Sequence, residues 1–266
     1  MDNLENKRMK GKHTAMIIIG SFLLIILGYF TIMSLRAPGK KLEEIRAKFG
    51  LQATPENKTD ERFYSDSAYM AMLKERAFLQ ARISMAETDS VYMTLNLADS
   101  TANLEISGVK VHSAKISDIK ISGILRRGNE YAISAMLSTP LNVVNDFASI
   151  KKEPLMIKMA PKDTSEFKPD IIPDTTDYEP VNYILQMDNG IRIIVYQETD
   201  TVTSDKNNLF FFDLNQRLKN TWSSFKSIAR FRVPEYHPFI RIRLPKADAK
   251  ILYRATPRRS QIAVYM

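Results

Sequence analysis

The sequence predicts a mainly β protein with a few helices, preceded by one N-terminal transmembrane helix. The N-terminal region contains a run of 22 uncharged residues, Thr14 to Leu35. From Ser90 onward, apolar residues recur at every second position in short runs that Gly and Asn residues separate. A period of two is typical of strands with one buried face, so residues 89–266 are expected to form a folded β domain.

The segment 14–35 is long enough to cross a bilayer. At ~1.5 Å per residue the run extends about 33 Å, whereas a hydrocarbon core is ~30 Å thick. The residues at its end, SLRAPG, are a poor match to the small-residue cleavage site of a signal peptide. We therefore interpret 14–35 as an uncleaved transmembrane signal anchor.

The charges beside the span favour neither orientation strongly, because four Lys or Arg residues lie in 1–13 and five lie in 36–48. A short tail before a large C-terminal domain favours a cytoplasmic tail, residues 1–13, and an exported domain. We therefore expect a single-pass inner-membrane protein whose C-terminal domain lies in the periplasm.

Residues 36–88 are predicted to form a tether and a juxtamembrane helix. Pro38, Gly39 and Gly50 interrupt the tether, which leaves only a short helix from Leu42 to Phe49.

A stronger helix is expected over 66–86, capped by Asp66 or Ser67. Its apolar residues recur at helical spacing, namely Tyr69, Met72, Leu73, Leu79, Ile83 and Ala86. The favoured interpretation is that this stripe packs on its own domain. The alternative is a stalk or partner helix beside the membrane.

Alternating apolar residues predict a series of strands within 89–266. These are 91–97, 104–106, 109–111, 116–124, 131–137 and a strand around Met156 and Lys158. Asp188-Asn189-Gly190 lies between two apolar runs, 181–185 and 191–195, which predicts a β-hairpin. Residues 160–180 contain four prolines and six acidic residues, so they are expected to form an extended surface loop.

An amphipathic helix is predicted over 208–229, and the C-terminal part of the chain is strongly basic. The apolar stripe of this helix consists of Phe211, Leu214, Leu218, Trp222 (or Thr221), Phe225 and Ile228. We interpret the stripe as core, with a binding face as the alternative. Between residues 216 and 259, twelve Lys or Arg residues stand against Glu235 and Asp248. This excess indicates either a solvated basic surface or attraction to anionic lipid head groups or an acidic envelope partner.

The stretch from His237 to Tyr265 is predicted to contain a strand, a short helix and a closing strand. Phe239, Arg241 and Arg243 alternate with Ile240, Ile242 and Leu244, which predicts a strand that buries its aliphatic side. Pro245 ends this strand because proline cannot donate to a ladder. Residues 247–253 are expected to form the helix, and 262–265 the last strand.

This stretch resembles the C-terminal end of L,D-transpeptidase catalytic domains, the cysteine enzymes that cross-link peptidoglycan. The family signature S-H-G-C-I-R-L is followed by an Asp-Ala pair, a Leu-Tyr pair and a hydrophobic strand. The same order is found here in Ile242-Arg243-Leu244, Asp248-Ala249, Leu252-Tyr253 and Ile262-Ala263-Val264-Tyr265. The resemblance implies an L,D-transpeptidase-like β-sandwich that lies outside the inner membrane.

The catalytic residues of that family are missing, and the chain has no cysteine. If His237 takes the place of the family histidine, Pro238 and Phe239 stand where Gly and Cys should be. If the Ile-Arg-Leu triplet is aligned instead, Arg241 takes the cysteine position. The strand that bears a His-Gly pair in the family is matched here by 192–196, which contains no histidine.

The resemblance therefore implies a pseudoenzyme, and no catalytic residue is assigned. The candidate residues for contact with a ligand or partner are His237, Arg241, Arg243, Arg192 and Tyr196. The three histidines are scattered and no H-E-x-x-H, G-x-S-x-G or glycine-rich phosphate motif is present, so neither a metal nor a cofactor is expected.

The leading hypothesis is a membrane-anchored cell-envelope protein with a catalytically inactive L,D-transpeptidase-like domain. It would bind or scaffold peptidoglycan, anionic lipid or envelope protein partners. The alternative is a structural subunit of a multi-protein envelope complex, and a lesser one is a hydrolase or transpeptidase with an unrecognised non-cysteine site. Nucleic acid is disfavoured as a partner because the span and the export separate the domain from DNA.

Overall fold

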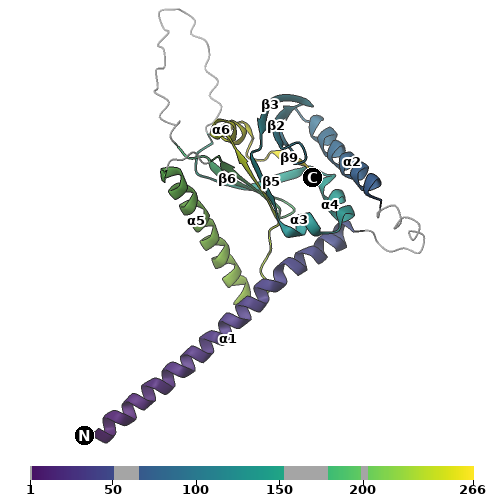
Figure 1. Cartoon of the computed structure of the whole chain (residues 1–266). Helices are drawn as coiled ribbons and strands as arrows, with labels where there is room; N and C mark the ends of the chain where they lie inside the picture. The colour runs from purple at the N-terminus through teal and green to yellow at the C-terminus, as the bar shows by residue number, and fades with distance from the viewer. Residues whose placement is uncertain (1, 51–65, 153–178, 199–202) are drawn as a thin grey trace, which may run out of the picture. The chain divides into compact units, whose positions relative to one another are not determined.

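A computed structural model describes residues 2–50, 66–152, 179–198 and 203–266 (Figure 1). The chain divides into two compact units. The first combines Met1–Glu44 with Asn215–Tyr236, and the second combines Ile45–Leu214 with His237–Met266. The predicted strand near Met156 and nearly all of the predicted loop 160–180 lie outside the described residues.

Helix α1, Asp2–Phe49, dominates the first unit. Within the described residues it is the one helix that is long and apolar enough to cross a membrane, by length and composition. The prediction that Pro38 and Gly39 end the helical segment is wrong, because α1 continues through both. Ala37 and Ile45, on either side, are buried, so tertiary contacts offset the hydrogen bond that proline removes.

The second unit is built on a mixed sheet of nine described strands in the order β3-β2-β1-β9-β5-β6-β7-β8-β4. The β1–β9 and β7–β8 pairs are parallel and the other pairs are antiparallel. The strands are β1 Tyr92–Asn96, β2 Thr101–Ile106, β3 Val109–Lys115, β4 Asp118–Ile121, β5 Leu141–Ala148, β6 Asn182–Met187, β7 Arg192–Gln197, β8 Phe239–Leu244 and β9 Gln261–Tyr265. The helices are α2 Ser67–Ala86, α3 Gly123–Arg127, α4 Glu130–Leu137, α5 Thr203–Ile228, of which residues 203–214 belong to this unit, and α6 Lys246–Ala255.

Strands β3 and β4, which stand at the two ends of this order, are joined by only two residues, Ile116 and Ser117. β3 ends at Lys115 and β4 begins at Asp118, a separation of about 10 Å at ~3.4 Å per residue. The N–H of Ile116 donates to the carbonyl of Ser100 (2.8 Å), beside β2, and the next N–H, of Ser117, donates to the carbonyl of Arg243 (3.0 Å), on β8. The sheet therefore curls until its first and last strands are continuous.

The interior of the curled sheet is the main core, and its strands follow the predicted alternation. Ile240, Ile242 and Leu244 of β8 are fully buried, whereas Arg241 and Arg243 between them are half-buried. The predicted hairpin is confirmed as β6 and β7, whose turn includes Gly190 at φ 85°. The helix after Pro245 and the closing strand are confirmed as α6 and β9.

Helix α2 confirms the prediction over 66–86, and the Asp66 side chain caps it by accepting from the Ala68 N–H (2.9 Å). The predicted packing face is wrong. The helix buries Met70, Ala77, Ala81 and Met85, at intervals of seven, four and four residues, and leaves Tyr69, Met72, Leu79 and Ile83 exposed. Small side chains allow close approach to β9, and the Arg82 guanidinium pairs with the buried Glu105 carboxylate on β2 (2.9 Å).

The strand predicted over 131–137 is instead helix α4, and Ile124 belongs to helix α3. The Asn129 side chain accepts from the Ala132 N–H (2.9 Å) and so caps α4. The buried residues Ala132, Ile133, Met136 and Leu137 recur at helical spacing. The alternation of Tyr131, Ile133 and Leu137 is thus one part of a helical pattern.

Helix α5 confirms the predicted amphipathic helix, but most of its apolar stripe is not core. Phe212 and Ile228 are buried, whereas Phe211, Leu214, Leu218, Trp222 and Phe225 are exposed. The interpretation of the stripe as a core face is therefore wrong.

Candidate functional site

Four of the five candidate residues lie on the outer face of two neighbouring parallel strands. In β7, Arg192, Ile194 and Tyr196 alternate with the buried Ile193 and Val195. The register pairs Arg192 with Phe239, Ile194 with Arg241, and Tyr196 with Arg243. Because the aliphatic residues of both strands fill the interior, the arginines and Tyr196 share the opposite face.

Tyr196, near the end of β7, is the buried residue of this outer face. Its hydroxyl donates to the Asp213 carboxylate, and its ring packs edge-on against Phe212 with centroids 6.4 Å apart. The Arg241 guanidinium lies over the same ring, 5.8 Å from its centroid. Burial and the nearby Asp213 carboxylate raise the pKa of Tyr196 well above the ordinary value of a phenol. Tyr196 therefore stays neutral and orients Arg241.

Strand β4 extends the face on the other side of β8 and places like charges opposite each other. Lys120 is directly across from Arg241 and Asp118 is directly across from Arg243. Directly opposed side chains have Cβ atoms ~5 Å apart, at which like charges destabilise the pair. The Asp118 carboxylate lies 3.6 Å from Arg243 Nε, too far for a hydrogen bond, and this buried Nε has no hydrogen-bond partner among the described residues.

We name Lys120, Arg192, Arg241 and Arg243 the basic face. Lys120 was absent from the sequence prediction, because the alternation of Ile119 and Ile121 places it on an outer face without showing which strand lies beside it. The pairing of β4 with β8 is a tertiary contact.

His237 lies near the Arg192 end of the basic face and far from Arg243 at the other end. Its Nδ1 is 3.2 Å from the Gly190 carbonyl oxygen, and the Pro238 carbonyl accepts from the Arg192 N–H (2.8 Å). These contacts tie the segment before β8 to the β6–β7 turn. His237 precedes Arg243 by six residues, about 20 Å along an extended chain, so the two cannot act on one small group. Phe239, on the same face as the arginines, is half-buried.

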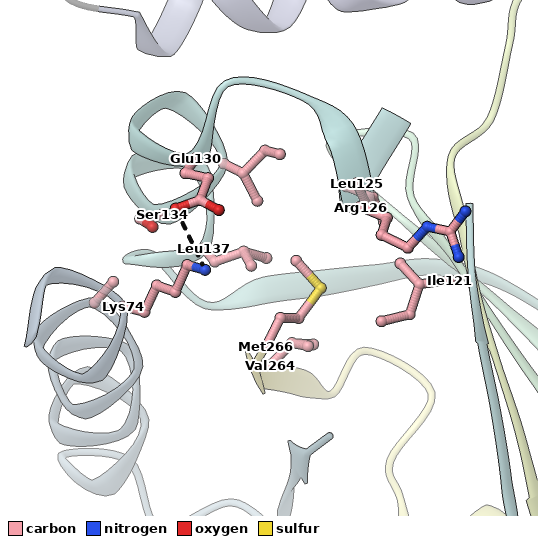
Figure 2. A pocket seen from close by; sticks show the side chains of 11 residues that line it. Lys74, Ile121, Leu125, Arg126, Glu130, Ser134, Leu137, Val264 and Met266 are labelled. Carbon is pink, nitrogen blue, oxygen red and sulfur yellow. Dashed lines mark ion pairs between the residues drawn. The ribbon is translucent and has the colours of Figure 1, made fainter. Parts of the chain in front are cut away.

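A separate cavity of about 190 Å³ lies among α2, α3, α4 and the end of β9 (Figure 2). Its walls are mostly apolar, including Leu125, Leu137 and Val264, and Lys74 and Glu130 form an ion pair at 3.6 Å on one side. This cavity was not predicted, because the alternation in 131–137 indicated a strand where α4 forms one wall. Its volume is below the ~300 Å³ at which ligand pockets usually begin, so it fits a small apolar group at most.

A third group of polar residues lies near the end of β5. The Asp146 carboxylate accepts from the Tyr253 hydroxyl (2.9 Å) and lies 3.5 Å from the Lys152 ammonium. The ammonium is also 4.9 Å from the centroid of the Tyr253 ring. Burial lowers the pKa of Lys152, and the Asp146 carboxylate opposes that shift. The partners satisfy one another, which is typical of a structural tie between β5 and α6.

The chemistry available on the basic face is anion binding. Guanidinium groups present paired donors that match carboxylates and phosphates, and Lys120 adds a point charge. No group of three His, Asp or Glu side chains that could hold a metal occurs in the part of the chain that the structure describes. Comparison of the chain with protein-family models, curated proteins and solved structures finds no match.

Proposed function

We propose that this chain is a membrane-anchored cell-envelope protein whose β domain binds or scaffolds peptidoglycan or another anionic envelope partner. In this proposal residues 14–35 anchor it in the inner membrane and the β domain lies in the periplasm. The domain acts as a catalytically inactive relative of the L,D-transpeptidases. The observation that carries the proposal is the placement of Lys120 directly opposite Arg241 on the exposed side of β4 and β8.

The placement of Lys120 opposite Arg241 carries an electrostatic cost. Two cationic side chains that project from directly opposed positions, with Cβ atoms ~5 Å apart, repel each other, and a bound anion converts the repulsion into two attractive contacts. Peptide stems of peptidoglycan carry free carboxylates, which suit an Arg donor pair. The basic segment of the chain adds long-range attraction for the same class of ligand.

The inactive character rests on the residues that replace the family nucleophile. Acyl transfer requires a nucleophile that a neighbouring base can activate, and the chain contains no thiol. The two alignments place Phe239 or Arg241 at the cysteine position, and both residues lie on the outer face of β8. The likeness of residues 237–265 to the transpeptidases supports a retained binding surface without its reaction.

A binding assay with matched variants tests the proposal. The full chain in nanodiscs is titrated with soluble tetrapeptide-stem fragments of peptidoglycan at two salt concentrations. Lys120→Gln is expected to weaken binding about fivefold, the loss of one exposed ion pair of ~1 kcal/mol. Lys110→Gln, on the other edge strand β3, is the matched control and should leave binding unchanged. Equal affinity of wild type and Lys120→Gln would contradict the proposal.

The same fragments test the absence of catalysis. After incubation with the full chain, mass spectrometry should recover the tetrapeptide stems unchanged. Measurable cross-linking or hydrolysis would refute the pseudoenzyme and favour an unrecognised non-cysteine site.

The structural-subunit alternative has one observation in its favour. The exposed stripe of α2 lines a shallow groove formed by Met72, Glu75, Arg76, Leu79, Gln80 and Ile83. Exposed apolar side chains at helical spacing with charged neighbours are typical of a helix that packs on another protein. Purification from native membranes in mild detergent distinguishes the two functions, because a lone monomer would contradict the subunit and a co-purifying partner lost in Leu79→Gln would support it.

A further inference from the structure

The exposed face of α5 in the first unit has the composition of a membrane-surface helix. Leu218, Trp222 and Phe225 recur at intervals of four and three residues and so lie on one side. Leu218 and Trp222 are 61% and 72% exposed, and the Trp222 and Phe225 rings stack with centroids 6.1 Å apart. Ser224 and Ser227 on the other side are half-buried, and Ile228, at one border of the apolar face, is buried. The helix therefore leaves its aromatic face uncovered.

Basic residues border this aromatic face on both sides. At ~100° per residue, Arg217 and Lys219 lie about a quarter turn to either side of Leu218, and Lys226 lies on the same border as Lys219. Long basic side chains beside an apolar stripe can extend their charged ends to phosphates while their stems stay among apolar atoms. The pattern matches a helix that lies in the membrane interface.

A contact within the first unit places the end of α5 beside the apolar part of α1. The Phe231 ring lies 6.1 Å from that of Tyr29. Tyr29 precedes Leu35, the last residue of the proposed span, by six residues, or ~9 Å along the helix. Phe231 therefore meets α1 about 9 Å inside the proposed span, at a depth where acyl chains surround the helix.

Phe231 is an exposed aromatic residue in a backbone conformation that favours glycine. Its N–H donates to the Ile228 carbonyl (2.9 Å), and its φ is 56°, in the left-handed region where helices usually end on glycine. A non-glycine residue in this region costs on the order of 1 kcal/mol. Phe231 is nevertheless 82% exposed, so no protein contact among the described residues covers the ring fully. Insertion among acyl chains would offset that cost.

We infer that residues 215–231 form a second membrane contact, in which α5 lies on an anionic lipid surface with Leu218, Trp222, Phe225 and Phe231 inserted below the head groups. Trp222 is nine residues from Phe231, so it lies within ~14 Å of the residue that touches Tyr29. The inference rests on the membrane anchoring that the proposed function includes.

The single tryptophan of the chain makes this contact measurable. The full chain is reconstituted in phosphatidylcholine–phosphatidylglycerol vesicles whose acyl chains carry bromine. Bromine quenches Trp222 only if the ring lies among the acyl chains. We expect strong quenching, a blue-shifted emission and protection from acrylamide. Emission that stays red-shifted, open to acrylamide and unaffected by bromine would overturn the inference.

Matched variants separate the lipid contact from other causes of burial. Leu218→Gln with Phe225→Gln should weaken the bromine quenching, whereas Asn220→Gln on the polar side should leave it unchanged. Replacing Arg217, Lys219 and Lys226 by Gln should reduce the quenching to the level seen in vesicles without phosphatidylglycerol. Blue-shifted emission without bromine quenching would instead show that a second copy of the chain covers this face, and would also overturn the inference.

Flotation with vesicles after alkaline carbonate extraction tests the anchor separately. A chain that fails to float refutes the anchoring itself. A chain that floats while Trp222 remains open to acrylamide refutes only the role of α5.

Discussion

The strands and the two long amphipathic helices of this protein use their apolar residues differently. In β8 the aliphatic side is fully buried and the arginine side faces outward. In α2 and α5 many of the large apolar side chains face outward, whereas Met70, Ala77, Ala81 and Met85 of α2 and Phe212 and Ile228 of α5 are buried. The strands of the curled sheet supply most of the main core, to which Leu125 of α3, Ile133 of α4 and Leu252 of α6 also belong.

The difference indicates where this protein meets other molecules. A strand in a curled sheet has one inner and one outer side, so its apolar side has a single destination. A helix carries a wider apolar arc than one contact needs, and the remainder is free to meet lipid or protein. The exposed stripes of α2 and α5 are therefore the surfaces on which partners are expected.

The largest effect should follow from a cavity inside the sheet. Ile242 is fully buried in β8, between β7 and β4. Ile242→Ala should lower the free energy of unfolding by about 4 kcal/mol, from lost burial and an unfilled cavity. Denaturant unfolding of the detergent-solubilised chain, followed by far-UV circular dichroism, measures the loss. Ile242→Val is the control at about 1 kcal/mol. Equal losses in the two variants would show that the interior is not closely packed.

An intermediate effect is expected where α2 joins the sheet. Arg82→Met leaves the Glu105 carboxylate buried without its partner and should cost about 3 kcal/mol. The same unfolding assay should show that Glu105→Leu in the Arg82→Met background restores most of the stability. A double variant as unstable as the single one would mean that packing, rather than charge, holds α2 in place.

The smallest effect belongs to the exposed stripe of α2. Leu79→Gln should change the free energy of unfolding by less than about 0.5 kcal/mol, because the side chain is exposed and helix propensity is nearly unchanged. Ala81→Leu, on the packed side of the same helix, should cost about 1–3 kcal/mol by overpacking. Thermal unfolding in detergent compares the two. If Leu79→Gln lowers the free energy of unfolding more than Ala81→Leu does, the exposed stripe of α2 contributes to folding, and the contrast between strands and helices does not hold.

Local sequence patterns predicted most of the strands and failed where the same pattern fits both a strand and a helix. The alternation in 239–244 and the turn at Gly190 led to β8 and the β6–β7 hairpin because a strand admits one buried side. The same reasoning failed at 131–137, where the Asn129 cap and the buried Ala132 and Met136 make a helix. Of the basic face, Arg192, Arg241 and Arg243 were predicted, and Lys120 was not.

The sequence by itself determined the apolar segment 14–35, the β character of the domain and the absence of a thiol, because each follows from composition or local spacing. Only the tertiary structure decided that β4 lies beside β8, which places Lys120 opposite Arg241. It also decided which side of α2 and α5 is covered. Hydrophobic burial acts through the area removed from water, and a stripe of apolar residues does not specify the surface that removes it.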